Sequence, residues 1–192
     1  MNEMLFIRHA ETDMAGTFCG HSDPPINGAG RAQIAKLLDA LRGEDISVVY
    51  TSDLQRAVAT GQAIAEFFGV PCVSRRGLRE IDFGTWDGLT WQQIEAVDPA
   101  YAQRWLDEFP NLPAPQGEGV EEFEARVQAE VDYLQRQCDT GSIAIVTHAG
   151  VMRCVLRTVC ALDEKMAWEL TSGYTCFFRC DRAGHSLEGA LR

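Results

Sequence analysis

Long hydrophobic runs are missing from this 192-residue sequence, whose longest apolar stretches are only as long as a β-strand. A membrane-spanning helix needs about 20 consecutive apolar residues, so we expect no transmembrane segment. The first residues, MNEMLFIRHAE, carry an early acid and lack the basic stretch and cleavage site of a signal peptide. We therefore expect a cytoplasmic protein with no membrane partner.

Positive charge is also scarce in this chain. Its 17 Lys and Arg stand against 28 Asp and Glu, which gives a formal net charge of −11. Because the long-range field of such a chain repels nucleic acids and anionic membrane surfaces, neither is expected as a partner. A small anion can still bind, but only in a pocket that gathers several basic groups.

The cysteine and histidine patterns of metal sites are absent as well. Seven cysteines occur without a C-x-x-C pair, and the four histidines form no H-E-x-x-H or H-x-H cluster. Most cysteines stand among apolar neighbours and no secretion signal precedes them, so we interpret them as buried, reduced thiols. We expect neither a metal nor another cofactor.

Strand-like apolar runs alternate with helical periodicities along the chain. The runs predict strands at 3–8, 47–52, 71–74, 142–148 and 173–180. Helices are predicted after the capping residues Asn27 and Ser52, at 90–97, 99–108 and 120–138, and from Gly150 onwards. This order predicts an α/β fold, a three-layer α/β/α sandwich with a mostly parallel central sheet. We expect one domain over residues 1–192, with a mobile tail from about 181.

Basic side chains follow three of the predicted strands. The first strand ends at Arg8-His9, the second is followed by Arg56, and the fourth ends at His148 just before Gly150. Ligands of parallel sheets collect at the carboxyl ends of the strands. A cation in the first turn of a helix opposes the helix dipole, by about 0.3–1 kcal/mol, so Arg56 suggests an anion nearby. Free N–H groups at the helix that begins near Gly150 favour an anion too. The pattern predicts a phosphate pocket.

Two histidines in such a pocket indicate chemistry as well as binding. A neutral imidazole can attack phosphorus to form a phosphohistidine, while the remaining groups neutralise charge on the phosphoryl group. A proton donor is still needed for the leaving oxygen, and a carboxyl group beside a phosphate has a raised pKa. Residues 77–89 offer Glu80, Asp82 and Asp87. The spacing alone does not choose among them.

Four ordered segments of the chain resemble the histidine phosphatase superfamily, in its phosphoglycerate-mutase-like branch. They are IRHAET (7–12), SDLQRAVAT (52–60), LREIDFGTWDG (78–88) and VTHAGVMR (146–153). The resemblance implies a phosphohistidine on His9, with Arg8, Arg56 and His148 holding the phosphoryl group. It implies Glu80 as the proton donor and then the base, and it implies a cap at about 77–119 that selects the substrate.

Two positions depart from the family pattern. Ala10 stands where the family usually has Gly after the nucleophile, and its methyl group either crowds the pocket or is tolerated. Ala15 stands where many members have a phosphate-binding Asn, so this contact is weakened or passes to Thr12. Neither change removes a group that the chemistry requires. His21, in the loop after the nucleophile, is expected to brace that loop.

The length of the chain and its GHSDPP and QGEG loops are similar to those of α-ribazole phosphatases. The leading hypothesis is therefore a metal-independent phosphomonoesterase for a small phosphorylated metabolite, such as α-ribazole 5′-phosphate. A phosphoglycerate mutase and a catalytically idle phospholigand-binding module remain the alternatives. In the cap, aromatic side chains are expected mainly to pack, but any that face the pocket would favour a substrate with an apolar body (Trp86, Trp91, Tyr101, Trp105, Phe109). The sequence leaves open whether the protein is a monomer or a homodimer.

Overall fold

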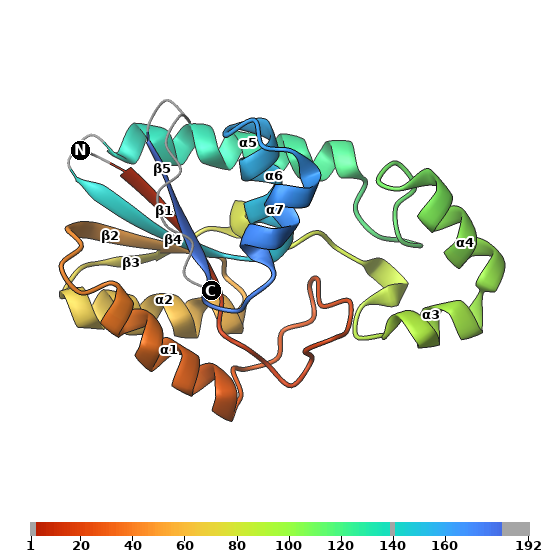
Figure 1. The fold of residues 1–192 in the computed structure, drawn as a ribbon, viewed down its shortest axis with the longest axis horizontal. Coiled ribbons are helices and arrows are strands. Elements are labelled where there is room, and N and C mark those ends of the chain that lie inside the picture. Colours follow the sequence, from red (N-terminus) through yellow and green to blue (C-terminus); the bar gives the residue numbers. More distant parts are fainter. Residues whose placement is uncertain (1–2, 139–140, 182–192) are drawn as a thin grey trace.

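The computed structural model describes residues 3–138 and 141–181, and within them a five-stranded mixed sheet forms the centre (Figure 1). The strands stand in the order β3–β2–β4–β1–β5, with β5 antiparallel to β1 and the other pairs parallel. Their bounds are β1 Glu3–Arg8, β2 Ile46–Thr51, β3 Cys72–Ser74, β4 Ser142–Thr147 and β5 Phe177–Asp181. The predicted, mostly parallel sheet is confirmed.

Alternate residues of each strand point to opposite faces of this sheet, and helices cover both faces (Figure 1). In β1, Leu5 and Ile7 pack with α1 and α2, whereas Met4 and Phe6 pack with α5, α6 and α7. These helices are α1 Gly28–Ala40, α2 Gln55–Phe68, α5 Val120–Gln137, α6 Ala149–Thr158 and α7 Glu164–Thr171. The three-layer α/β/α sandwich is therefore confirmed. Within residues 3–138 and 141–181, none of the helices has the length and apolar character needed to cross a bilayer.

A smaller group of elements extends beyond the carboxyl ends of the strands, at the right of Figure 1. It contains the short 3₁₀ helix η2 Gly84–Trp86 and the helices α3 Trp91–Val97 and α4 Pro99–Glu108. The 3₁₀ helix η1 Arg76–Leu78 comes before it, and its Leu78 packs with α5 in the core of the sandwich. We call residues 77–119 the cap. The cap has an apolar core of its own, centred on Trp86 and Ile94, against which Trp91, Tyr101 and Trp105 pack.

The starts of α1 and α2 differ in how they are capped. Asn27 caps α1 as predicted, because its side chain accepts a hydrogen bond from the Gly30 N–H. The prediction that Ser52 caps the next helix is wrong, since α2 begins only at Gln55. Asp23, in a distant loop, accepts the Gln55 N–H at 2.6 Å instead. A capping partner 32 residues away leaves no local sequence pattern.

The end of the chain contains a helix that the sequence did not reveal. The helix predicted after Gly150 ends at Thr158, and α7 follows at Glu164–Thr171, capped by the side chain of Asp163. The last strand begins at Phe177 rather than at 173. The predicted tail starts at Asp181, which ends β5, and residues 182–192 lie outside the described part of the chain.

The interpretation of the cysteines as buried thiols is correct for four of them. Cys138, Cys154, Cys176 and Cys180 are buried. Cys19 and Cys160 are half-buried, and Cys72 is exposed because it lies on β3, an edge strand of the sheet.

Candidate active site

Side chains from three neighbouring strand ends meet at the carboxyl edge of the sheet. His9 follows β1 and His148 follows β4, the neighbour of β1, and their ring centroids lie 5.0 Å apart. Arg56 comes from the first turn of α2, and its Nε lies 3.3 Å from His9 Nε2. All three side chains are buried. The structure thus brings together the basic residues that the sequence placed at strand ends.

The ring of His9 is held in one orientation and one tautomer. Its Nδ1 lies 2.7 Å from the carbonyl oxygen of Ala10, so this nitrogen carries the proton and donates it. The pKa of His9 lies well below its usual value, because burial, and after it the charges of Arg56 and Arg8, oppose a positive ring. Nε2 therefore carries no proton, and its lone pair, which a nucleophile requires, faces the Arg56 Nε–H at 3.3 Å.

His148 and Arg8 carry buried polar atoms with no hydrogen-bond partner in the described part of the chain. These atoms are both ring nitrogens of His148 and the Nε of Arg8. A buried donor or acceptor without a partner costs about 1–3 kcal/mol, so native structures rarely contain several together. Burial above all, and then Arg56, hold the pKa of His148 well below its usual value. The cluster fits a ligand that accepts hydrogen bonds.

The two arginines are anchored differently. Arg56 donates its Nε–H to His9 and its terminal N–H groups to the backbone oxygens of Cys19, Gly20 and Ser22. It therefore ties the loop around residues 19–22 to the site and keeps few donors for a ligand. Arg8 uses only Nη1, which donates to the carbonyls at 171 and 172, while its guanidinium stacks 4.2 Å from the ring centroid of Tyr174. Its Nε edge stays available for bidentate binding of a phosphate.

Glu80 is the carboxylate that the structure places beside these groups. Together with Arg8, His9 and Thr12 it lines a cavity of about 270 Å³, which we call the phosphate pocket. Its Oε2 accepts the Gly150 N–H at 2.9 Å, and its Oε1 accepts the Ile81 N–H. These bonds hold a buried carboxyl group at the start of α6.

The other two candidate acids have structural partners instead. Asp87 accepts hydrogen bonds from the backbone N–H groups of residues 20, 21 and 22, so it shapes this loop. Asp82 accepts the Gly84 N–H and lies 3.3 Å from Nδ1 of His21. Neither lines the phosphate pocket. The geometry thus favours Glu80, which the spacing did not single out.

The remaining predicted residues lie at the margins of the site. The Thr12 hydroxyl lines the phosphate pocket and accepts the Met14 N–H. The Gly150 N–H donates to Glu80, so this glycine positions the Glu80 carboxylate. His21 Nε2 lies 3.1 Å from the Glu80 carbonyl oxygen, a contact that fits a bracing role. Ala15 is exposed, whereas the methyl group of Ala10 is fully buried.

Two further residues of the pocket were not anticipated. Arg153 lines the pocket from α6, and Tyr174 lies over His9 with the ring centroids 5.7 Å apart. Arg153 follows Gly150 by three residues, a spacing that places both on one face of a helix, so this signal was present. No sequence pattern indicated Tyr174, because its position depends on how the loop after α7 returns to the sheet.

The Gly150→Ala substitution is expected to lower kcat about 10- to 100-fold while the protein stays folded. An added Cβ would stand 2.1 Å from Glu80 Oε1, so the flexible carboxyl group must leave its place. Alanine favours a helix by up to about 1 kcal/mol over glycine, and α6 should therefore not unfold. Steady-state kinetics with thermal unfolding would test this. Unchanged kcat would show that the position of Glu80 does not matter.

Stability is expected to fall as the pH drops below about 6.5. His9 and His148 have lowered pKa values in the folded protein. Between about pH 6.5, the usual pKa of histidine, and these lowered values, the unfolded chain therefore binds more protons than the folded protein. Above the pKa of histidine in the unfolded chain, both rings are neutral in both states and the stability is not reduced. From about pH 7 to 5.5 the free energy of unfolding should therefore decrease steadily. Urea unfolding measures this, and His148→Gln should flatten the dependence. An equally steep dependence in the variant would contradict the assignment.

A metal site is a separate question. Within residues 3–138 and 141–181, no three His, Cys, Asp or Glu side chains gather closely enough to hold a metal ion. The basic pocket itself is composed of arginine and neutral imidazole, which suits an anion.

This α/β fold, with a buried neutral histidine among cations at the strand ends, suits the binding of a phosphoryl group. The family model of the histidine phosphatase superfamily (branch 1) matches residues 4–188, and the chain belongs to that superfamily. The resemblance seen in the sequence is therefore confirmed.

Relatives with similar sequences bear the names of phosphatases. The adenosylcobalamin/α-ribazole phosphatase of Salmonella typhimurium is 27% identical over 180 residues, which cover 93% of this chain and 89% of the relative. Phosphoserine phosphatase 1 of Hydrogenobacter thermophilus is 25% identical over 189 residues, covering 97% and 86%. The crystal structure of the α-ribazole phosphatase from Shigella flexneri shares the fold, with a TM-score of 0.85 at 23% identity and coverage of 98% and 95%. These similarities support a phosphatase or mutase-type enzyme.

Proposed function

We propose that this protein is a metal-independent phosphomonoesterase that transfers a phosphoryl group first to His9 and then to water. The observation that carries the proposal is the state of His9. Its ring is buried and neutral, with Nδ1 donating to the Ala10 carbonyl and Nε2 directed at the cationic cluster. A nucleophile held in this way gains from orientation, because little conformational freedom is left to lose in the transition state.

In the first step, His9 Nε2 attacks phosphorus and the bond from phosphorus to the ester oxygen breaks. Arg8 and Arg56 neutralise the charge on the phosphoryl oxygens and His148 donates a hydrogen bond to them, which together meet the main catalytic requirement of this reaction. Glu80 gives its proton to the leaving oxygen and releases the alcohol. The negative charge of the bound phosphate favours the protonated form of a neighbouring carboxyl group.

In the second step, water attacks the phosphohistidine. Glu80, now a carboxylate, takes a proton from the water, and the bond between phosphorus and Nε2 breaks. Inorganic phosphate is released, and His9 is again neutral. The same carboxyl group thus acts as acid and then as base, as microscopic reversibility in a two-step displacement requires.

We propose α-ribazole 5′-phosphate as the first substrate to test. Two observations support it: the chain covers most of a relative with this activity in its name, and its compact loops are similar to those of that group. The cytoplasmic location stays a prediction, as does the expectation that the protein is a monomer or a homodimer.

Rapid mixing with a ³²P-labelled phosphoester and an acid quench tests the mechanism. We expect an acid-labile, alkali-stable phosphoprotein and steady turnover that EDTA does not change. Loss of activity in EDTA with rescue by one metal would contradict the metal-free mechanism. Conversion of 3-phosphoglycerate in the presence of a bisphosphate primer, without net hydrolysis, would identify a mutase. No turnover of any phosphoester would indicate a binding module.

A further inference from the structure

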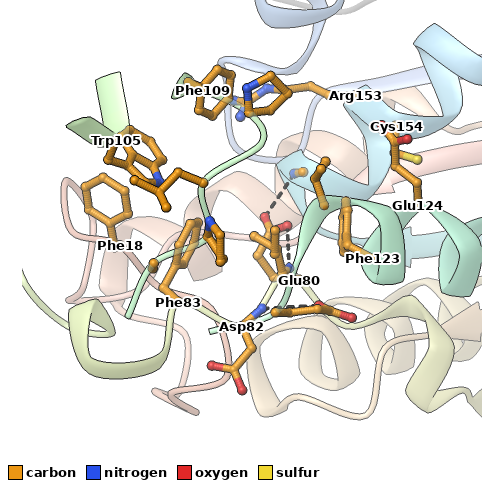
Figure 2. Close-up of a pocket in the computed structure, with 18 of the residues that line it drawn as sticks. Phe18, Glu80, Asp82, Phe83, Trp105, Phe109, Phe123, Glu124, Arg153 and Cys154 are labelled. Atoms are coloured by element: carbon orange, nitrogen blue, oxygen red, sulfur yellow. Dashed lines mark hydrogen bonds between the residues drawn. The ribbon is translucent and has the colours of Figure 1, made fainter. Parts of the chain in front are cut away.

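A large groove adjoins the phosphate pocket, between the cap and the helices α5, α6 and α7 (Figure 2). Its volume is about 570 Å³. The groove and the phosphate pocket share lining residues, among them Glu80, Phe83 and Arg153. A phosphoester that places its phosphate beside His9 therefore directs its organic body into this groove.

The walls of the groove are predominantly apolar. Figure 2 shows Phe18, Phe83, Trp105 and Phe109 on the cap side, with Phe123 facing them from α5. Prolines and aliphatic residues of 110–114 continue the same wall. Sugar hydroxyls placed deep in such a groove would lose water without gaining partners, at a cost of about 1–3 kcal/mol each. The groove thus fits an apolar body better than a sugar.

The aromatic wall is fixed before any ligand arrives. The buried Trp86 packs edge-on against Trp105 at 5.4 Å between ring centroids, and Trp105 packs against Phe109 at 5.1 Å. Phe18 and Phe83 form a further edge-to-face pair at 5.0 Å. Since these rings are already ordered by one another, binding a flat ligand costs little additional conformational entropy.

Three large apolar side chains at the groove are unusually exposed. Leu106 is 52%, Phe109 45% and Trp168 48% exposed. Large apolar side chains that stay exposed around one cavity mark a ligand or partner site. Because this groove shares lining residues with the phosphate pocket, the organic part of the substrate is the occupant that the geometry favours.

Charges around the groove argue against a second anionic group on the substrate. Glu124 and Glu164 line it, and Arg157, the cation on that side, lies 3.7 Å from Glu124. Arg153 lies at the junction with the phosphate pocket, where its guanidinium stacks 3.3 Å from the Trp168 ring centroid and its Nε donates to Thr171. The positive charge of Arg153 therefore lies beside the phosphate pocket, whereas the acids Glu124 and Glu164 line the groove away from it.

We propose that the groove selects phosphomonoesters whose alcohol carries a large, uncharged, apolar or aromatic body. The inference rests on the proposed function and names its substrate class. Phosphoserine and phosphoglycerates, which carry a carboxylate and no apolar body, are poor substrates on this view. Groups of the size of two fused rings fill the groove.

Two aryl esters with alcohols of similar acidity test the groove. We expect kcat/KM for 2-naphthyl phosphate to exceed that for phenyl phosphate about tenfold, from the apolar area of the second ring. In Leu106→Asp and in Phe109→Asp this ratio should fall to about twofold or less. Val97→Asp is the matched control, because Val97 is an exposed apolar residue of the cap outside the groove. It should leave the ratio unchanged.

The outcomes separate the two proposals. If the phenyl ester is hydrolysed through a phosphohistidine but the naphthyl ester is no better, the groove proposal is overturned and the mechanism stands. A kcat/KM for L-phosphoserine or 3-phosphoglycerate above that for 2-naphthyl phosphate would overturn it too. If neither aryl ester forms a phosphoenzyme, the proposed function itself fails.

Discussion

The His9→Ala substitution is expected to lower kcat by at least about 10⁴-fold, because removal of a nucleophile leaves only binding and charge stabilisation. The ³²P-labelled phosphoprotein should disappear completely. Alanine removes a ring that is buried beside Arg56 and His148, so thermal unfolding should be measured on the same preparation.

His148→Gln is the matched comparison for this loss. The variant lacks the second imidazole but keeps His9 and its hydrogen bond to the Ala10 carbonyl. We expect it to form the phosphoprotein slowly, about 10²- to 10³-fold below the original rate, as when one charge-stabilising donor is lost. A ³²P-labelled phosphoprotein that still forms in His9→Ala would show that another residue is the nucleophile and would contradict the proposed mechanism.

The Glu80→Gln substitution is expected to lower kcat/KM for an alkyl phosphate by about 10²- to 10⁴-fold, the usual contribution of a general acid. The effect should be smaller for 4-nitrophenyl phosphate, whose alcohol leaves without a proton. Hydrolysis of the phosphohistidine also needs the base, so the labelled intermediate should accumulate. Single-turnover kinetics with both esters would separate the two steps.

Asp82→Asn gives the comparison for Glu80. The Asp82 carboxylate pairs with His21 and lies outside the phosphate pocket, so its loss should cost less than the loss of Glu80 for both esters. A larger loss in Asp82→Asn, or equal losses for the two esters in Glu80→Gln, would reassign the proton donor.

The sequence by itself determined the layers of the fold and the composition of the pocket. Apolar runs such as LFI and IAIV predict buried strands, and the residue after each such run lies at a sheet edge whatever the loops do. Arg8, His9 and His148 could therefore be placed from local pattern alone. The Asn27 cap was also local, since its side chain reaches a backbone N–H three residues away.

The tertiary structure decided what depends on contacts between distant segments. It placed Glu80, which the resemblance had implied, in the phosphate pocket and left Asp82 and Asp87 outside it, because Glu80 accepts a hydrogen bond from the start of α6, 70 residues further on. It also placed Tyr174 over His9 and assembled the apolar groove from the cap and three helices. Such choices follow from side-chain packing and long-range hydrogen bonds, which leave no periodic trace in a single sequence. Strand ends are specified locally, whereas the contacts of Glu80 and the lining of the groove depend on the assembled fold.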